Sequence, residues 1–447
     1  MRLRGLNVLA LTMLCLASVE FVARAPVRAV KSSEWTDFLS PYVQSRAWIH
    51  GADPYRDATL LRFWPPGQEI PDFIKLDFAN GRLAAKRGMP SPYPLTAFVL
   101  LSPIAALPWA FARSLWLAIN LIAFLLMLWL MVSLAHADWR DLRTQIFLAF
   151  TVALAPVHTG VATANPVIVV VALCVTTVFL AQQGRALASG MTLAVGVSLK
   201  PTVAMAFVIF YIVHRQWRMV GVTCATSAVL MVAGMARLWR SGFSWLPSYL
   251  ENSAKVFSRG SIDDFTPANR SWFNMVNAQV AFYSLVKSVV WSNVLTFLIV
   301  GSLLGLWLWF IIKNRAGWNL LALSTLVTIC LLPVYHRFYD AVLLIFPLAW
   351  AWLCARPKQR WRISALVAPF LIPGAALLGQ TGLAASVSRM PTTSFDWRLL
   401  LLSHEAWLLL LLSAVLLYEM RSLGSTDPFQ EEVCVQLQRS VPREYAN

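Results

Sequence analysis

The chain has 447 residues, of which 58% are hydrophobic and 13% are charged, and its mean hydropathy is +0.62. Several apolar runs reach the roughly 20 residues that cross a bilayer as a helix, and continuous runs of this kind exclude a membrane β-barrel. The net charge of +16 lies mainly in loops and termini, where it indicates orientation and contact with anionic lipid rather than binding of nucleic acid. We predict an all-α polytopic membrane protein.

The first apolar run spans residues 6–22, follows two arginines and ends at Ala23-Arg24-Ala25. This pattern fits either a cleaved signal peptide or an uncleaved first helix with its N-terminus in the cytoplasm. We expect the uncleaved helix. Both alternatives place the following loop on the outer side.

The loop of residues 26–91 is the only long polar loop in the first half of the chain. It carries Trp35, Trp48, Tyr55 and Trp64 among prolines and charges. Amphipathic rings favour the membrane interface, so we expect short helices there. Because the first crossing delivers this loop to the membrane surface, we expect it to be the outer catalytic loop.

Three short basic loops set the orientation of the later crossings. Residues 214–218, 313–315 and 356–362 hold Lys and Arg but no acid, which is typical of cytoplasmic loops. With these anchors the chain is predicted to cross about 12 times, with a transmembrane domain over 1–424 and a cytoplasmic tail over 425–447. The predicted crossings are 6–22, 93–108, 114–135, 146–157, 165–181, 187–213, 219–236, 288–312, 318–333, 338–354, 363–378 and 399–418.

One segment fits this count badly. The count places residues 136–143 outside although they include Arg140 and Arg143, and Asp138 and Asp141 weigh little in the orientation rule. The following run, 146–157, is also shorter than a full crossing. We therefore expect a broken or re-entrant helix between residues 144 and 165.

Asp37 lies near the start of the stretch 35–55 of the first loop. If residues 38–50 are helical, Tyr42 and Arg46 share one face and His50 follows one turn later. Asp37 could take a proton from an acceptor hydroxyl as a general base, or it could be the N-cap of this helix. The residues alone leave both alternatives open, and Asp53-Pro54-Tyr55 reads as a turn.

Lys200 lies within an apolar run and precedes Pro201. An ionisable residue inside a membrane segment indicates a function or a buried partner, whereas a kinked helix would let Lys200 reach back to an interface. The functional interpretation is contact with a lipid-linked phosphate.

A polar corner, residues 335–340, joins two late apolar runs. His336 and Arg337 could hold a phosphate leaving group there, or Arg337 could simply pair with Asp340. The earlier segment 258–277 is rich in Asn, Trp and Arg, which suits sugar hydroxyls and ring faces, although a solvated loop has the same composition.

Four motifs follow one another over about residues 30–350. They are Asp37 through Tyr55, Ser91-Pro92-Tyr93-Pro94, Asn165 with the run to Leu199-Lys200-Pro201, and His336-Arg337-Phe338-Tyr339-Asp340. Together they resemble glycosyltransferase family 87, the polyprenyl-phosphate-sugar-dependent membrane enzymes of the GT-C superfamily. Pro94 is followed by Leu95 where the family has a second proline, and Gly160 by Val161 where it has Gln.

The resemblance implies a GT-C fold with a large first outer loop and inverting transfer of a hexose, often mannose, from a polyprenyl-phosphate donor. Asp37 falls on the family's general base, and Lys200, His336 and Arg337 fall near the donor phosphate. The acceptor would be a hydroxyl of a lipid or glycan at the outer face of the cytoplasmic membrane. The remaining candidates for substrate binding are Tyr42, Arg46, His50, Asp53, Tyr55, Tyr93, Asn165 and Asp340.

Two other functions fit the residues. A transporter or flippase of lipid-linked sugars would show internal symmetry and charges paired at mid-membrane, and a polysaccharide polymerase or ligase would place its large outer loop late in the chain. We expect no cofactor and no metal site. The adjacent Asp263-Asp264 pair is no DxD motif, yet the sequence leaves a divalent cation open.

Overall fold

The computed structural model describes residues 2–31, 37–68, 91, 93–242, 244–269, 271–314, 320–380 and 401–423. Within these ranges the chain is helical, and its β pairing is one isolated bridge between Met275 and Arg337. The predicted all-α polytopic class is confirmed. Several residues lie outside the described ranges. They are Glu69, Asp72 and Asp77, which are further acids of the first loop, together with Pro92, Arg270 and the predicted tail 425–447.

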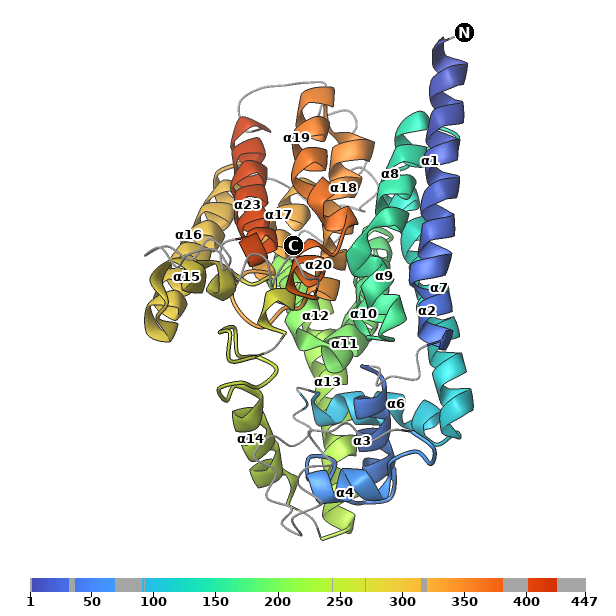
Figure 1. Ribbon diagram of the computed structural model, residues 1–447, viewed down its shortest axis with the longest axis vertical. Coiled ribbons are helices and arrows are strands. Elements are labelled where there is room, and N and C mark those ends of the chain that lie inside the picture. The colour runs from blue at the N-terminus through green and yellow to red at the C-terminus, as the bar shows by residue number, and fades with distance from the viewer. Residues whose placement is uncertain are drawn as a thin grey trace.

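Most of the predicted apolar segments are helical, and Figure 1 shows the helices in chain order. In the first half they are α1 (Arg2–Arg24), α2 (Pro26–Lys31), α3 (Leu39–Ile49), α4 (Asp57–Arg62), α6 (Leu95–Ala105), α7 (Trp109–Leu134), α8 (Leu142–Ala153), α9 (Ala155–Ala162), α10 (Val167–Gln182), α11 (Ala186–Leu199) and α12 (Pro201–Val213). In the second half they are α13 (Trp217–Arg240), α14 (Trp245–Val256), η1 (Trp272–Asn274), α15 (Ala278–Val286), α16 (Val289–Asn314), α17 (Leu320–Cys330), η2 (Phe338–Leu344), α18 (Ile345–Ala349), η3 (Trp350–Cys354), α19 (Pro357–Val367), η4 (Ala368–Leu371), α20 (Gly374–Gln380) and α23 (His404–Leu423).

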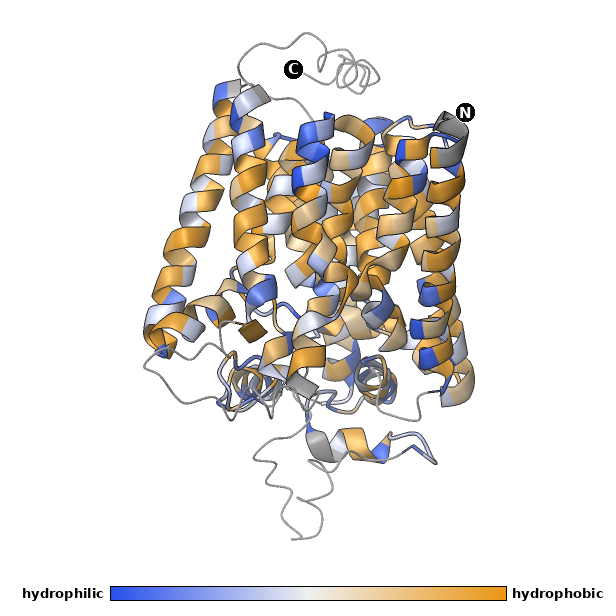
Figure 2. Cartoon of the chain, turned by 45° about the horizontal axis from the view of Figure 1, so that its top comes forward, coloured by the Kyte–Doolittle hydropathy of each residue, from blue (hydrophilic) through white to orange (hydrophobic). Residues whose placement is uncertain are grey.

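Five described helices are long and apolar enough to cross a membrane, and the bent pair α8–α9 makes a sixth. Six shorter apolar helices accompany them. Figure 2 shows a band of apolar residues across the bundle with hydrophilic residues toward its two ends. Apolar surface facing outward in this band is what a lipid environment requires.

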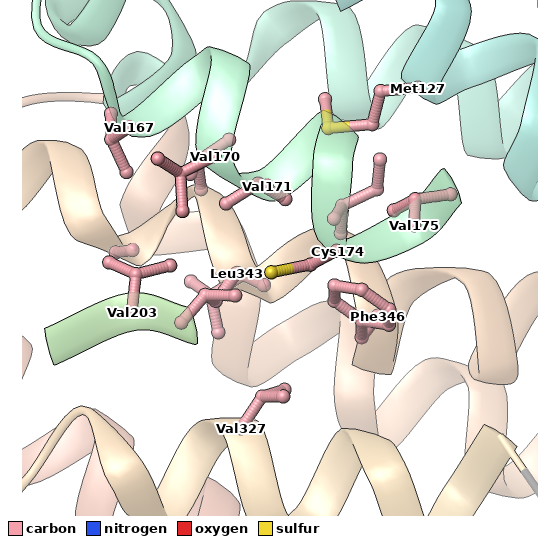
Figure 3. Packing of buried hydrophobic residues seen from close by; sticks show 14 of the residues in the cluster. Met127, Val167, Val170, Val171, Cys174, Val175, Val203, Val327, Leu343 and Phe346 are labelled. Carbon is pink, nitrogen blue, oxygen red and sulfur yellow. The ribbon is translucent and has the colours of Figure 1, made fainter. Parts of the chain in front are cut away.

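The core lies where the central helices meet (Figure 3). Side chains of α7, α10, α12, α17, η2 and α18 interdigitate there, and most of them are β-branched or aromatic. Phe207 of α12 packs on Phe346 of α18 with ring centroids 5.4 Å apart. This packing fixes the positions of the helix ends that carry the polar residues described below.

The bundle has two ends of different character. At the site end, as we call it, Asp37, Asn165, Lys200 and Arg337 line one cavity. Helix α1 packs along α8, and the ring of Phe21 lies 5.7 Å from that of His158. The second half of α1 therefore lies beside α9, near the site end, and the N-terminus lies at the opposite end.

The loop 136–143 belongs to that opposite end. Arg143 and Asp141 act electrostatically on Arg360 at the start of α19, so this loop lies beside the basic loop 356–362. The prediction that placed these two loops on opposite sides is wrong. We call this end, with the loops 136–143 and 356–362, the basic end.

The error arose because α6 does not cross the bundle. Its 11 residues span only about 16 Å at 1.5 Å per residue. Tyr93, just before α6, lines the cavity with Asp37, and the carbonyl of Leu107, just after it, accepts hydrogen bonds from Tyr42 and Arg46 of α3. Both flanks of α6 therefore lie at the site end, and α7 alone runs from there to the basic end.

A second error compensates for the first. The predicted single crossing 187–213 is a hairpin of α11 and α12 that turns at Lys200. Only three residues join α12 to α13, and Ser189 of α11 donates a hydrogen bond to Met219 of α13 at 2.9 Å. The end of α12 thus returns to the start of α11. The predicted count loses one crossing at α6 and gains one at the α11–α12 hairpin. The predicted total of about 12 is therefore unchanged, and it stays a prediction.

The expected break between residues 144 and 165 is confirmed. Helices α8 and α9 meet at an angle of 48°. Leu154 between them is extended (φ −60°, ψ 119°), and Pro156 opens α9 at a position where it needs no amide donor. Because of this bend, α9 ends beside Asp37 and Asn165, at the site end.

Candidate active site

Asp37 is placed by the turn that ends α9. Its backbone N–H donates to the carbonyl of Thr163 at 2.8 Å, and its carboxylate accepts a hydrogen bond from the Asn165 amide at 2.9 Å. The N-cap of α3 is Phe38, and no side chain caps that helix. The alternative in which Asp37 serves as a helix cap is therefore wrong.

Asn165 connects Asp37 to Lys200. Its side-chain oxygen accepts from the Val167 N–H at 3.0 Å and from the Lys200 ammonium at 3.2 Å, while its nitrogen donates to Asp37. The preceding Ala164 is left-handed (φ 55°), and its carbonyl is held by the indole of Trp116 at 2.8 Å. The Asn165 side chain is thus held by the Val167 N–H, and the backbone before it is held by Trp116.

Lys200 occupies the turn between α11 and α12 and is buried. Its ammonium pairs with the carboxylate of Asp340 and lies 4.5 Å from the centroid of the Tyr339 ring. Lys200 therefore has the buried partner that one of the two alternatives expected. A buried ammonium needs such a partner, since an isolated charge of this kind is very costly to desolvate.

Asp340 is the centre of a second set of contacts. Besides Lys200, its carboxylate accepts from His336 Nδ1 and from the Arg337 backbone N–H, each at 3.2 Å. The Arg337 guanidinium points elsewhere, donating to the Tyr335 hydroxyl at 2.8 Å and to the Ile262 carbonyl at 3.3 Å. The predicted alternative of an Arg337–Asp340 ion pair is therefore wrong.

These contacts surround one open cavity of about 130 Å³. Asp37, Asn165, Lys200 and Arg337 all line it, as does Tyr93. Burial, and after it the charge of Asp37, raises the pKa of the Tyr93 phenol, which keeps this hydroxyl available as a donor. The other lining residues are Ser40, Ser91, Leu199, Pro201, Thr202, Ile262, Tyr335 and Tyr339.

Two predicted site residues hold the loop instead of lining the cavity. Tyr42 and Arg46 share a face of α3, as expected, and the guanidinium donates to the Tyr42 hydroxyl at 2.8 Å. Both donate onward to the Leu107 carbonyl between α6 and α7. They connect the base of the cavity to the first long helix after the loop.

Three others lie farther from the cavity. His50 is exposed and bonds the Arg46 carbonyl at 2.8 Å. The expected turn is present, since Asp53 Oδ1 accepts from the Tyr55 N–H at 2.9 Å. The Tyr55 hydroxyl then donates to the Tyr93 carbonyl at 3.1 Å, so this turn positions a residue that does line the cavity.

His336 is buried behind Asp340 and does not appear among the lining residues. Its backbone carbonyl accepts from the Val276 N–H at 2.9 Å, which ties the corner 335–337 to the segment before α15. Tyr335, Tyr339 and Ile262 were not predicted as site residues. The two tyrosines lie within the corner motif, but no pattern in the sequence indicates that Ile262 reaches the cavity.

The arrangement separates two carboxylates by environment. Asp340 is fully buried and neutralised by Lys200, whereas Asp37 is partly exposed to the cavity and receives one described hydrogen bond from an uncharged amide. Within the described part of the chain, two of the five N–H donors of Arg337 have hydrogen-bond partners, which leaves three for a ligand. The site therefore presents an accessible carboxylate and a cation to one small space. Among the described residues no group of three His, Cys, Asp or Glu side chains could hold a metal ion.

Comparison with known protein families matches residues 92–334 to glycosyltransferase family 87. Searches of curated proteins and of solved structures gave no match. The matched segment covers more than half of the chain and includes Tyr93, Asn165 and Lys200 of the cavity. This polytopic membrane protein therefore belongs to glycosyltransferase family 87.

Proposed function

We propose that the protein transfers a hexose, mannose as the resemblance implies, from a polyprenyl-phosphate donor to a hydroxyl of a lipid or glycan, with inversion. The single observation that supports this most is the cavity itself. Among the described residues that line it, Asp37 is the only acid, and it faces Arg337 and Lys200 there.

Asp37 is the proposed general base. A base must be able to take a proton from the acceptor, and a carboxylate already neutralised by a buried ammonium is poorly suited to this. Asp340 is in that position, whereas Asp37 is held by the amide of Asn165. The hydrogen bond from Asn165 also fixes the orientation of the Asp37 carboxylate, which favours a productive geometry.

Arg337 is the proposed contact of the departing phosphate. Fixed positive charge in a water-poor site stabilises developing negative charge more than it would in water. The Lys200 ammonium spends two of its three N–H donors on Asp340 and Asn165, which leaves one for the same phosphate. Tyr93, Tyr335 and Tyr339 complete the wall with hydroxyls and ring faces.

The site end is proposed to lie on the non-cytoplasmic side of the cytoplasmic membrane. The short loops of the basic end carry Arg140, Arg143, Arg356, Lys358 and Arg362, and short loops rich in Lys and Arg remain in the cytoplasm. A donor lipid embedded in the bilayer would be confined beside the site, which reduces the entropic cost of meeting the acceptor.

The test is transfer from radiolabelled polyprenyl-phosphate mannose, glucose and galactose in proteoliposomes supplied with membrane extract. Asp37→Asn removes the base but keeps the shape, and we expect at least about a 100-fold loss of transfer. Asp138→Asn, an exposed acid of the basic end, is the matched control and should transfer like the wild type. Full activity of Asp37→Asn would exclude Asp37 as the base.

A further inference from the structure

A second, larger cavity of about 500 Å³ lies at the site end between the loop 257–266 and helices α15 and α16. Its volume is within the ~300 to 1,000 Å³ typical of small-molecule sites. Figure 1 shows the loop after α14 leading to α15 and α16 in this part of the molecule. The lining residues are Phe257, Arg259, Asp263, Asp264, Phe265, Thr266, Gln279, Tyr283, Lys287, Val289, Asn293, Val334 and Tyr335.

The two cavities share one wall. Tyr335 lines both of them, and its hydroxyl accepts the hydrogen bond from Arg337. Arg337 also donates to the carbonyl of Ile262, which lines the first cavity, while the next residue, Asp263, lines the second. A ligand in the second cavity would therefore lie directly beside the proposed phosphate contact.

The loop that forms the outer wall is held by its own hydrogen bonds. The Asp264 carboxylate accepts from the Gly260 N–H at 2.6 Å and from the Thr266 N–H and hydroxyl at 2.9 and 3.0 Å. The amide of Asn269 donates to the Asp264 carbonyl at 2.9 Å. A wall fixed in this way loses little conformational entropy when a ligand binds.

Other polar groups of the cavity remain without a partner among the described residues. Oδ1 of Asp263 is buried and accepts no hydrogen bond. Asn293 accepts from Gln279 at 2.6 Å through its oxygen, and no hydrogen bond of its amide nitrogen is found within the described ranges. Tyr283 and Phe265 add an edge-to-face aromatic pair with centroids 5.9 Å apart.

These groups favour a hydroxyl-rich ligand. The lining combines charged side chains of both signs, Arg259, Lys287, Asp263 and Asp264, with the amide of Asn293 and the ring of Tyr283. A sugar ring offers hydroxyls that both donate and accept, and an apolar face for an aromatic side chain. A buried polar group left unpaired is costly, so a ligand that satisfies it gains specificity.

We propose that this cavity binds a sugar ring of the acceptor, with Asp263 and Asn293 contacting its hydroxyls. The inference rests on the proposed function, because it assigns the acceptor to a glycan or a glycolipid headgroup. It places the acceptor on the far side of Tyr335 from the transfer cavity.

The test measures binding to the full-length protein in nanodiscs by saturation-transfer NMR. The probes are methyl α-mannoside, methyl β-glucoside and methyl β-galactoside. Nanodiscs containing the corresponding diacylglycerol glycosides form a second arm, in which the lipid competes with the methyl glycoside. Competition would identify the acceptor sugar as a glycolipid headgroup. Binding of the methyl glycoside without competition would identify it as part of a free glycan.

Asn293→Leu and Asp263→Leu should each weaken glycoside binding at least tenfold. Gln183→Leu, an exposed amide of the basic end, is the matched control and should bind like the wild type. Asp37→Asn should also bind normally, so loss of transfer in that variant is separable from loss of the acceptor. If no glycoside binds the wild type, or if both cavity variants bind as well as it does, the proposal is wrong.

Discussion

At the residue scale, the buried contact between Lys200 and Asp340 joins two motifs that are 140 positions apart. Lys200 comes from the turn between α11 and α12, and Asp340 from η2. The sequence indicates an ionisable residue inside an apolar run but not its partner, because partners far apart in the chain are set by packing. His336 extends the contact behind Asp340.

We expect Lys200→Met to destabilise the protein by about 3 to 5 kcal/mol, because it leaves the buried Asp340 carboxylate without its cation. Lys200→Met combined with Asp340→Asn should recover much of this loss, since no uncompensated charge remains. Thermal unfolding in detergent measures both. Equal losses in the single and double variants would contradict this explanation, because the loss would then not come from an unpaired Asp340 carboxylate.

Asp263 gives a second prediction, on pH. Burial raises its pKa to about 8 from the usual 3.8, against the lowering effect of Arg337. The folded protein then binds this proton more tightly than the unfolded chain, so the contribution of Asp263 to stability falls as pH rises from about 4 to about 8.

Asp263→Asn should remove this dependence. The difference in unfolding free energy between variant and wild type should grow in favour of the variant by more than about 1 kcal/mol between pH 5 and pH 8. Arg259, Asp264, Lys287, Tyr283, Tyr335 and Arg337 surround the same cavity in both proteins, so their titration largely cancels. A constant difference across this range would contradict the assignment.

At the element scale, the hairpin of α11 and α12 depends on close packing of α11 against α13. A side-chain carbon added at Gly190 would lie 2.7 Å from the Met219 carbonyl oxygen and 2.8 Å from Val222. Backbone cannot move away as a flexible side chain can. Small residues allow this kind of approach between membrane helices.

Gly190→Ala should therefore cost about 1 to 3 kcal/mol of stability through overpacking. Gly221→Ala, in α13 itself, is the matched control because nothing lies within 4 Å of the added carbon, and alanine favours a helix over glycine. Unfolding temperatures should fall for the first variant and remain equal or rise for the second. A similar fall in both would contradict the contact.

The elements show what the sequence can and cannot predict. Apolar length located most of the long helices, and the short run 146–157 after a badly fitting loop indicated the bend between α8 and α9. Apolar length failed at α6 and at residues 187–213, because both segments are apolar. Only tertiary contacts show that α6 stays at the site end and that residues 187–213 turn back at Lys200. Asp37 and Lys200 were proposed from the residues themselves and Asn165 from the resemblance, whereas Ile262 and the second cavity depend on loops that packing positions.

At the scale of the whole molecule, the fold sorts its charges between two ends. Arg143 and Arg360 lie together at the basic end, while Asp37 and Arg337 lie at the site end. The corrected positions of α6 and α12 bring Arg140 and Arg143 into agreement with the orientation rule that they first violated. They also place Asn165 on the same side as Asp37, as their hydrogen bond requires.

This arrangement predicts which positions are accessible from each side of the membrane. In a chain whose six native cysteines are replaced by alanine, Asp138→Cys and Lys358→Cys should react with an impermeant maleimide only in inverted vesicles. Arg62→Cys, in α4 of the first loop, should react in intact cells. The reason is that positions 138 and 358 lie at the basic end, for which the short arginine-rich loops predict a cytoplasmic location. If position 138 is labelled from the same side as position 62, the predicted topology with residues 136–143 outside is restored and the contact with Arg360 is contradicted. If positions 138 and 358 react in intact cells and position 62 only in inverted vesicles, the proposed active site lies in the cytoplasm.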